Sequence, residues 1–193
     1  MGEKSKRKRQ YIIEKAKEVF LEKGFKNVTM KDVVEKCEIS RGGLYIYFAS
    51  TEEIFNAVIA QDKSSVENFF EQVVTDATAA ERLLLFLKDR KVEILNGNKE
   101  LTQATYEFYF ANQDAEDNVV KDRFDASVAI VGRLIAAGIE NGEFHCQDPE
   151  GAARNIMYMV EGLKIAAQTK GLTSEEVDRE FVYVLHSLGC EQD

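Results

Sequence analysis

The sequence predicts an all-α protein of nine helices, in which a short N-terminal helix-turn-helix module precedes a larger helical domain. Apolar residues recur at spacings of three and four along most of the chain, which is the period of amphipathic helices. Capping boxes of the form Ser/Thr-x-x-Glu stand at the start of two segments. Pro149 is the only proline in 193 residues, and no segment alternates apolar and polar residues as a strand does. This length suits one or two domains.

The first predicted helix covers about Lys6 to Lys23 and overlaps a charged stretch, residues 1–9. Gly24 ends the helix as a C-terminal cap. The charged stretch has two interpretations: a basic arm that contacts a polyanion, or a solvated, disordered tail. The apolar stripe of this helix consists of Ile13, Ala16, Val19 and Phe20.

Residues 29–48 predict two short helices joined by a tight turn at residues 37–39. Thr29 caps the first helix, and Asp32 stands three residues later in a capping-box-like position. Ser40 caps the second helix. The apolar faces are supplied by Val33 and Val34 in the first helix and by Leu44 and Phe48 in the second.

The other face of the second short helix is unusual, because Gly42 and Gly43 stand where helix formers are expected. In a helix interior each glycine costs about 1 kcal/mol relative to alanine. One interpretation is that the missing side chains let the backbone approach another surface, such as a DNA groove. The alternative is that the two glycines lie in a loop. The same face carries Arg41, Tyr45 and Tyr47.

Six more helices are predicted after this motif. Ser50 and Glu53 form a capping box that begins a helix of about 25 residues, 50–75, which we expect to connect the N-terminal module to the rest. The remaining predicted helices cover about 79–95, 99–112 and 116–140, then begin at Asp148-Pro149-Glu150 and at Thr173-Ser-Glu-Glu176.

The predicted helix over 99–112 contains four aromatic residues within five positions, Tyr106, Phe108, Tyr109 and Phe110. At about 100° per residue these side chains point in several directions, whereas a surface helix has one apolar stripe. We therefore expect this helix to be centrally buried or to line a cavity.

The net charge of −9 is distributed unevenly. Residues 1–48 contain 12 Lys and Arg and 7 Asp and Glu, which gives +5. The remainder contains 13 basic and 27 acidic residues, which gives −14. A basic N-terminal module suits a polyanionic partner, and the acidic remainder is expected to avoid one.

The cysteines Cys37, Cys146 and Cys190 are odd in number and far apart, so they predict no disulfide framework and no metal site. They are interpreted as inert thiols, with a redox sensor as the alternative. No apolar run reaches the length of a membrane span, and the N-terminus lacks the apolar core of a secretory signal. The expectation is a cytoplasmic protein with no membrane partner and no cofactor.

The N-terminal pattern resembles the TetR family of bacterial transcriptional regulators. The resemblance implies a DNA-binding domain over residues 1–49 and a ligand-binding and dimerisation domain over residues 50–193, with the helix over 50–75 as connector. It rests on Ile13, Ala16, Phe20, Gly24, Phe25, Thr29, Asp32, Val33, residues 40–48, Ser50 and Glu52, and more weakly on nine helices, residues 142–144 and residues 148–153.

In this family the second short helix enters the major groove, so the resemblance assigns roles to its residues. Arg41, Gly42 and Gly43 would lie near base edges, and a bidentate contact from Arg41 to guanine would be worth about 1–3 kcal/mol of discrimination. Thr51 stands where most relatives have a lysine, so it would contact a phosphate without a charge, and the basic arm would compensate. The other implied phosphate contacts are Thr29, Lys31, Ser40, Tyr45 and Tyr47.

The resemblance also implies a homodimer on double-stranded DNA, because a palindromic operator matches the twofold symmetry of the protein. Gly162 would allow close approach of a partner helix, and the alternative is a packing need within one chain. The implied interface residues are Met159, Gly162, Phe181, Leu185 and Leu188.

A small-molecule effector of unknown identity is implied for the C-terminal domain. We expect a small, mostly apolar molecule that stabilises an arrangement unable to bind DNA, so that the ligand releases a repressor. The alternative for the apolar residues is ordinary core packing, and for the charged ones a solvated surface. The candidate residues are Phe86, Arg90, Tyr106, Phe108, Tyr109, Phe110, Tyr158 and Glu161.

The alternative classes of protein are an enzyme and a helical adaptor that binds only protein. A nucleophile pair of Cys146 and His145 is poorly supported, because adjacent residues rarely face each other and no third orienting group is evident. The adaptor fits poorly with the +5 and −14 charge split and with the glycine and hydroxyl face of residues 40–48.

Overall fold

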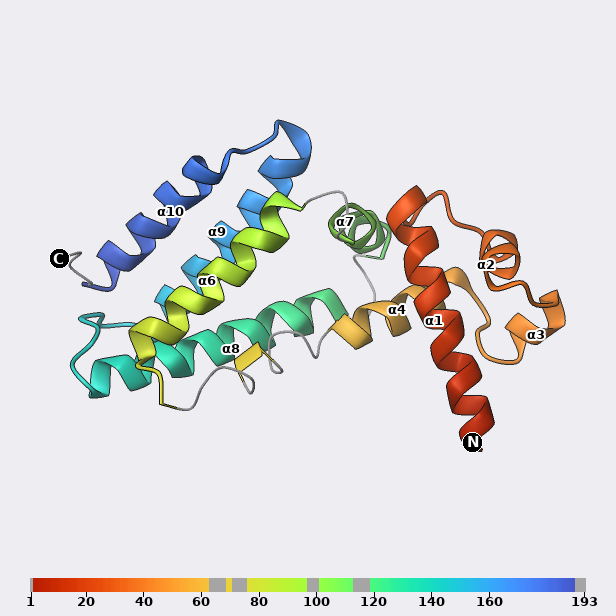
Figure 1. The fold of residues 1–193 in the computed structure, drawn as a ribbon, viewed down its shortest axis with the longest axis horizontal. Coiled ribbons are helices and arrows are strands. Elements are labelled where there is room, and N and C mark those ends of the chain that lie inside the picture. The colour runs from red at the N-terminus through yellow and green to blue at the C-terminus, as the bar shows by residue number, and fades with distance from the viewer. Residues whose placement is uncertain (1, 63–68, 71–75, 97–100, 113–118, 190–193) are drawn as a thin grey trace. The chain divides into compact units, whose positions relative to one another are not determined.

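The computed structural model describes residues 2–62, 69–70, 76–96, 101–112 and 119–189 (Figure 1). Within these ranges the chain forms nine α-helices and no strand, as the sequence predicts. The chain divides into two compact units. The first consists of Met1–Ser64 with Asn98–Val120, and the second of Ser65–Gly97 with Lys121–Asp193.

The first unit contains a helix-turn-helix between two longer helices. The first helix begins at Glu3, before the predicted start at Lys6. Most of the charged N-terminal stretch is therefore helical, and the alternative of a disordered tail is wrong there. The described helices of this unit are α1 (Glu3–Lys23), α2 (Met30–Cys37), α3 (Arg41–Tyr45), α4 (Thr51–Asp62) and α7 (Thr102–Ala111).

The core of the first unit gathers apolar faces from all five of these helices. Its centre is a cluster of phenylalanine rings in which Phe20 and Phe55 have centroids 4.7 Å apart. The ring of Phe108 from α7 lies 4.9 Å from that of Phe25 and 5.0 Å from that of Phe55. Such edge-to-face and tilted pairs add about 0.5–1.5 kcal/mol each beyond the area that they bury.

This core joins segments that the sequence analysis assigned to different domains. The expected boundary lay between residues 49 and 50, but Phe55 of α4 and Phe108 of α7 are buried together with α1. The continuation of α4 to about residue 75 falls largely on residues outside the described ranges, apart from two helical positions, Phe69 and Phe70. The functional division into two domains stays a prediction.

The second unit is a bundle of four described helices, as Figure 1 shows for α6, α8, α9 and α10. Their bounds are α6 (Ala79–Leu95), α8 (Val119–Glu140, whose first two residues belong to the first unit), α9 (Pro149–Thr169) and α10 (Ser174–Ser187). The predicted starts at Pro149 and after Thr173 are confirmed: Asp148 accepts from Gly151 N–H at 2.9 Å, and Thr173 and Glu176 form a capping box. None of the helices in the described ranges has the length and apolar character needed to cross a membrane.

Candidate nucleic-acid interface

The first helix of the helix-turn-helix is fixed by the predicted capping box. Thr29 Oγ1 accepts from Asp32 N–H at 3.3 Å, and Asp32 Oδ2 accepts from Thr29 N–H at 2.8 Å. Lys23 Nζ lies 2.6 Å from Asp32 Oδ1. The hydrogen bond from Lys23, followed by those from Thr29, lowers the pKa of Asp32 from 3.8 to about 2. The start of α2 is thereby tied to the end of α1.

The turn between α2 and α3 is made by a left-handed residue, Glu38, with φ of 53°. Ser40 then caps α3, because its Oγ accepts from Gly43 N–H at 3.1 Å. On the inner side Leu44 and Phe48 are 0% and 1% exposed, which confirms the prediction that both belong to the core. These contacts anchor α3 by one edge and leave its opposite face outward.

The outward face of α3 carries the residues that the sequence analysis selected. Arg41 and Gly42 are exposed, and Tyr45 is 43% exposed. The guanidinium carbon of Arg41 lies 5.6 Å from the centroid of the Tyr45 ring, a cation–π distance that favours one orientation of the arginine. Tyr47, just beyond the helix, is half-buried.

Gly42 and Gly43 lie inside α3, so the loop interpretation is wrong. Neither has a positive φ, so the helix backbone itself does not demand glycine. A Cβ on Gly43 would stand 3.1 Å from the capping Ser40 Oγ, which gives that glycine a local reason. A Cβ on Gly42 would meet no described atom within 4 Å. No described residue therefore requires a glycine at position 42. The missing side chain leaves the helix backbone accessible from outside.

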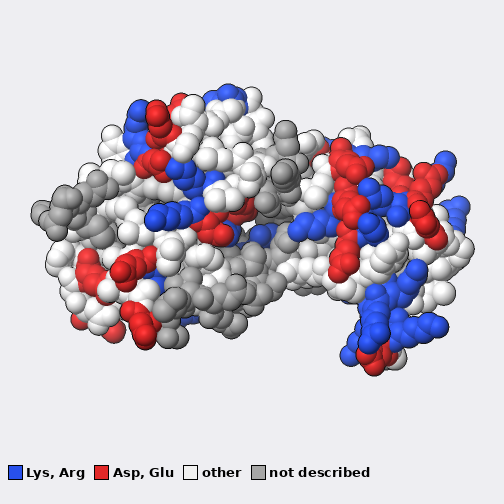
Figure 2. All heavy atoms as spheres, viewed as in Figure 1, with Lys and Arg blue, Asp and Glu red and all other residues white. Residues whose placement is uncertain are grey.

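Charge in the first unit is partly neutralised on the side of α1 that faces α2. Lys36 Nζ lies 3.1 Å from carboxylates of both Glu18 and Glu22, and Lys15 Nζ lies 2.7 Å from Glu18. These solvent-exposed pairs contribute little to stability. Figure 2 shows Lys and Arg side chains gathered over the N-terminal end of α1. The surplus of positive charge therefore lies toward that end of the helix.

The other residues with an implied phosphate contact differ in the interactions that they make within the protein. The hydroxyl of Thr29 lies 2.7 Å from Asp32 Oδ2 in the capping box. Lys31 Nζ stands 3.6 Å from Glu35 in a well-exposed pair, which leaves the ammonium accessible. Thr51 is the first residue of α4 and is half-buried. The roles of these residues at DNA stay predictions.

Two of the ligand candidates, Arg90 and Glu161, belong to an ion-pair network in the second unit, and a third, Phe86, packs against it. Arg90 is 7% exposed and pairs with Glu93 and Asp89, and its guanidinium carbon lies 5.5 Å from the ring centroid of the buried Phe86. Lys164 Nζ lies 2.7 Å from Glu93 and 3.1 Å from Glu161. Lys164, which the sequence analysis missed, thus links α9 to α6. The sequence feature that could have identified Lys164 is its position three residues after Glu161, a spacing at which two helical side chains can pair.

The electrostatics of this network favour its charged form. Burial raises the pKa of Glu93, but Lys164 and Arg90 outweigh burial and hold it below its ordinary value. The Nε of Arg90 is buried without a hydrogen-bond partner in the described residues. A buried donor left without a partner costs about 1–3 kcal/mol, so the unsatisfied Nε of Arg90 destabilises the bundle locally.

Of the other ligand candidates, four lie on α7 of the first unit and one, Tyr158, lies on α9 of the second. Phe108 is a core residue of the first unit, and the nearby Phe110 is 63% exposed with ring contacts to Tyr106 and Tyr109. Tyr158 is 61% exposed and stacks on Phe124 with centroids 4.9 Å apart. A ligand site formed by these residues stays a prediction.

The implied dimer residues fall into two groups. Phe181, Leu185 and Leu188 are 7%, 8% and 0% exposed, so the second unit already buries them. Gly162 lies beside open space, because a Cβ at this position would meet no described atom within 4 Å. A packing need within the described part of the chain therefore does not account for this glycine. Around it, Tyr158 and Ile165 of α9 are 61% and 42% exposed, and Met159 is partly buried against the bundle core.

Possible metal ligands and the cysteine thiols are the other chemically reactive groups of the described residues. No group of three or more His, Cys, Asp or Glu side chains in those ranges could hold a metal ion. Cys37 is buried, and burial raises the pKa of its thiol, which makes it less reactive. Cys146 Sγ donates to the backbone oxygen of Asp148 at 3.3 Å.

Comparison with known proteins gives consistent matches to both parts of the chain. Residues 12–58 match the family described as bacterial regulatory proteins, tetR family. Residues 82–178 match the tetracyclin repressor-like C-terminal domain.

Individual relatives extend over most of the chain. The uncharacterized HTH-type transcriptional regulator YfiR of Bacillus subtilis (strain 168) is 32% identical over 156 residues, which are 79% of this chain and 76% of YfiR. The fatty acid metabolism regulator protein of the same organism is 25% identical over 134 residues, 68% of each chain. Among solved structures, reduced Escherichia coli NemR matches with a TM-score of 0.80 and 16% identity over 96% of this chain and all of NemR, which shows a shared fold.

Proposed function

The chain belongs to the TetR family of bacterial regulatory proteins and is a DNA-binding transcriptional regulator, and from this premise we propose that it is a ligand-released repressor. It would bind a palindromic operator as a homodimer and block transcription sterically. Members of the family bind DNA and dimerise. A protein that acts on bacterial DNA works in the cytoplasm, which is where the proposal locates it.

The main support for DNA binding through α3 is the composition of its outward face. Gly42 leaves the helix backbone accessible, and Arg41 stands beside it, exposed and oriented by Tyr45. A recognition helix with this face can come close to the floor of the major groove, where a bidentate arginine distinguishes guanine from the other bases. Thr29, Lys31, Ser40, Tyr45, Tyr47 and Thr51 would then position the backbone without reading sequence.

The test is fluorescence anisotropy with duplexes tiled across the DNA upstream of the gene for this protein, with a scrambled duplex of equal length as control. A regulator of this kind binds one tile at least about a thousandfold more tightly than the scrambled duplex, and binding weakens as salt rises. Equal affinity for all duplexes would overturn sequence-specific regulation, and no binding even at low salt would favour the protein adaptor.

For the effector we propose a small, mostly apolar molecule bound in the C-terminal domain. The Arg90–Glu93–Lys164–Glu161 network supports one polar or charged group on that molecule, because Arg90 and Lys164 are largely buried cations held by neighbouring carboxylates. The relative named for fatty acid metabolism makes fatty acids reasonable first compounds to try. A thermal-shift series over fatty acids and neutral apolar compounds tests this, and absence of stabilisation by every member would contradict it.

For the dimer we propose that the face of α9 with Tyr158, Gly162 and Ile165 packs against a second copy. The open space at Gly162 supports this, because a helix without a side chain there lets a partner backbone approach closely. Sedimentation velocity of the Gly162→Leu variant is the test. Dissociation to monomers is expected, and an unchanged dimer would exclude this face.

A further inference from the structure

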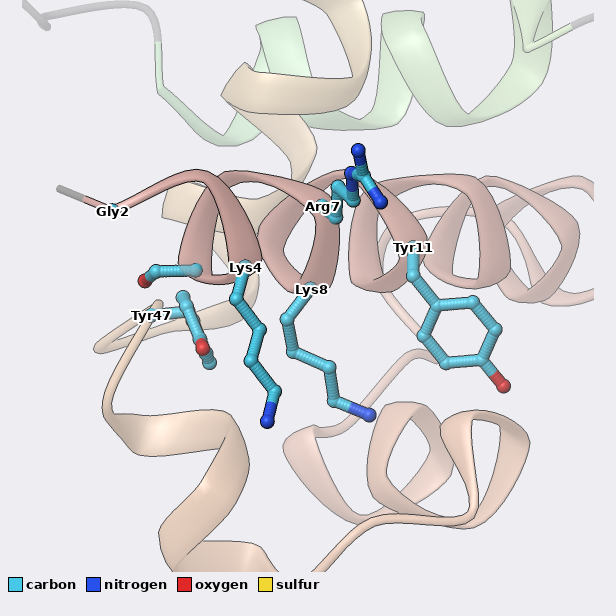
Figure 3. Close-up of a pocket in the computed structure, with 7 residues that line it drawn as sticks. Gly2, Lys4, Arg7, Lys8, Tyr11 and Tyr47 are labelled. Atoms are coloured by element: carbon cyan, nitrogen blue, oxygen red, sulfur yellow. The ribbon is translucent and has the colours of Figure 1, made fainter.

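An open hollow of about 640 Å³ lies beside the first turns of α1 in the first unit. Lys4, Ser5, Lys8 and Tyr11 of α1 line it together with Tyr47, which follows α3 (Figure 3). Figure 3 shows the side chains of Lys4 and Lys8 extending from α1 on the same side, toward the space next to Tyr47 and Tyr11. The hollow therefore joins the start of α1 to the segment just beyond the recognition helix.

The sequence builds this arrangement from helical spacing. Lys4, Lys8 and Tyr11 are separated by four and three residues, so they share one face of α1. Tyr11 is held against α2, because its hydroxyl donates to the carbonyl oxygen of Cys37 at 3.3 Å. The Lys8 ammonium lies 4.9 Å from the Tyr11 ring centroid. Tyr47 is positioned by its N–H, which donates to Leu44 O at 2.9 Å, next to the buried Phe48.

The chemistry of the lining suits an anion. Its lining residues include Lys, Arg, Tyr and Ser but no Asp or Glu. Arg7, which also lines the hollow, is paired with Glu3 at 2.6 Å. The guanidinium carbon of Arg9 lies 4.8 Å from the Phe48 ring centroid. Within the described residues, neither Lys4 nor Lys8 has a carboxylate within ion-pair distance. Two ammonium groups and the Tyr47 hydroxyl are therefore gathered around one open space.

We propose that this hollow binds the sugar-phosphate backbone of the operator beside the groove that α3 enters, so that α1 is a second DNA-contacting helix. This inference rests on the proposed DNA-binding function and adds a contact to it. The duplex backbone is the expected anion because Tyr47 lines the hollow and stands two residues after the end of α3, so an anion in the hollow would lie close to the DNA that α3 touches. Ammonium groups contact phosphate as point charges without reading bases, so the contact is independent of sequence.

This contact would also supply to the DNA-binding unit a positive charge of the kind that Thr51 lacks. Each phosphate neutralised by a lysine releases condensed counterions, and this makes the slope of log affinity against log salt more negative by about 0.9. Lys4 and Lys8 would thus act through affinity and its salt dependence, whereas Arg41 would act through sequence discrimination.

The experiment measures affinity for operator and scrambled duplexes at several salt concentrations, with the full-length chain. The double variant Lys4→Gln, Lys8→Gln is compared with a charge-matched control, Lys88→Gln, Lys170→Gln, whose residues are exposed in the second unit. For the Lys4, Lys8 variant we expect the slope of log affinity against log salt to become shallower by about 0.9 for each phosphate contact removed. The ratio of operator to scrambled affinity is expected to stay unchanged. The control is expected to keep the wild-type slope.

Equal slopes in wild type and the Lys4, Lys8 variant would overturn the inference while leaving the DNA-binding function intact. Failure of the wild type to bind any duplex would instead overturn the function on which the inference rests. A second variant, Tyr47→Phe, removes only the hydroxyl and is expected to weaken both duplexes by the same few-fold factor. Inorganic phosphate, added at constant ionic strength, is expected to leave DNA affinity unchanged. Saturable competition by phosphate would overturn the assignment to the duplex backbone.

Discussion

The backbone N–H of Lys26 donates a hydrogen bond of 2.9 Å to Oε2 of Glu107, which lies 81 residues later in the chain. Gln103 Nε2 donates to the other carboxylate oxygen at 2.8 Å and holds it in place. Burial raises the pKa of Glu107, but the backbone N–H of Lys26 and the Gln103 amide hold it below its ordinary value. With Phe108 packed on Phe25 one residue further along, α7 is fastened by a polar and an aromatic contact to the segment between α1 and α2.

Glu107→Ala is expected to lower the free energy of unfolding by about 1–2 kcal/mol, because the Lys26 N–H loses a charged acceptor. Glu107→Gln keeps an acceptor oxygen and is expected to lose less. Urea unfolding followed by circular dichroism measures both. Equal losses for the two variants would show that the carboxylate acts by its charge and not by accepting from Lys26.

Phe108→Ala is expected to cost about 3–5 kcal/mol of unfolding free energy, since it removes a ring from the buried cluster with Phe25 and Phe55. Phe110→Ala, on the same helix, is the matched control: its ring is 63% exposed and the change is expected to stay within about 0.5 kcal/mol. The same urea titrations measure both. A large loss for Phe110 with little for Phe108 would contradict the packing of α7.

Gly42→Ala is expected to keep or raise stability by up to about 1 kcal/mol, because alanine is the better helix former and its Cβ meets no described atom within 4 Å. The same methyl group would hold α3 away from the groove, so operator affinity is expected to fall roughly tenfold, which is about 1.4 kcal/mol. Thermal melting and anisotropy titration are run on one preparation. Undiminished operator affinity would show that Gly42 does not serve close approach.

Arg41→Lys keeps the charge and removes the planar fork, so it separates base reading from phosphate attraction. The ratio of operator to scrambled affinity is expected to fall by a factor that corresponds to about 1–3 kcal/mol, with an unchanged salt slope. Lys31→Gln serves as the contrast, because a lost phosphate contact weakens both duplexes alike and reduces the magnitude of the salt slope by about 0.9. An Arg41→Lys ratio equal to that of the wild type would exclude Arg41 from base reading.

Acid is expected to weaken the tie between α1 and α2 at Asp32. Its pKa is about 2 in the folded protein against an ordinary 3.8, so folding favours the ionised carboxylate. The contribution is fully present above pH 3.8 and is lost as pH falls toward about 2. The difference in unfolding free energy between wild type and Asp32→Asn should therefore shrink across this window. A constant difference would show that the charge of Asp32 does not stabilise α2.

Most of the helices and their ends could be predicted from the sequence, because their signals are local. The Thr29–Asp32 capping box, the Ser40 cap and the start of α9 at Pro149 each involve residues within three or four positions of one another. The burial of Leu44 and Phe48 follows from helical period in the same way. For the same reason the sequence predicts which residues lie on the outward face of α3, and these residues include the candidate DNA contacts of that helix.

Only the tertiary structure decided which distant segments meet. Four neighbouring aromatics on one helix looked alike in sequence, yet Phe108 is 7% exposed in the first core and Phe110 is 63% exposed. The pairing of Lys164 with Glu93, and the hollow shared by Lys8 and Tyr47, likewise join residues far apart in the chain. Periodicity tells which side of a helix is apolar, but the partner of that side depends on how helices cross. That choice is made by packing the whole unit to high density.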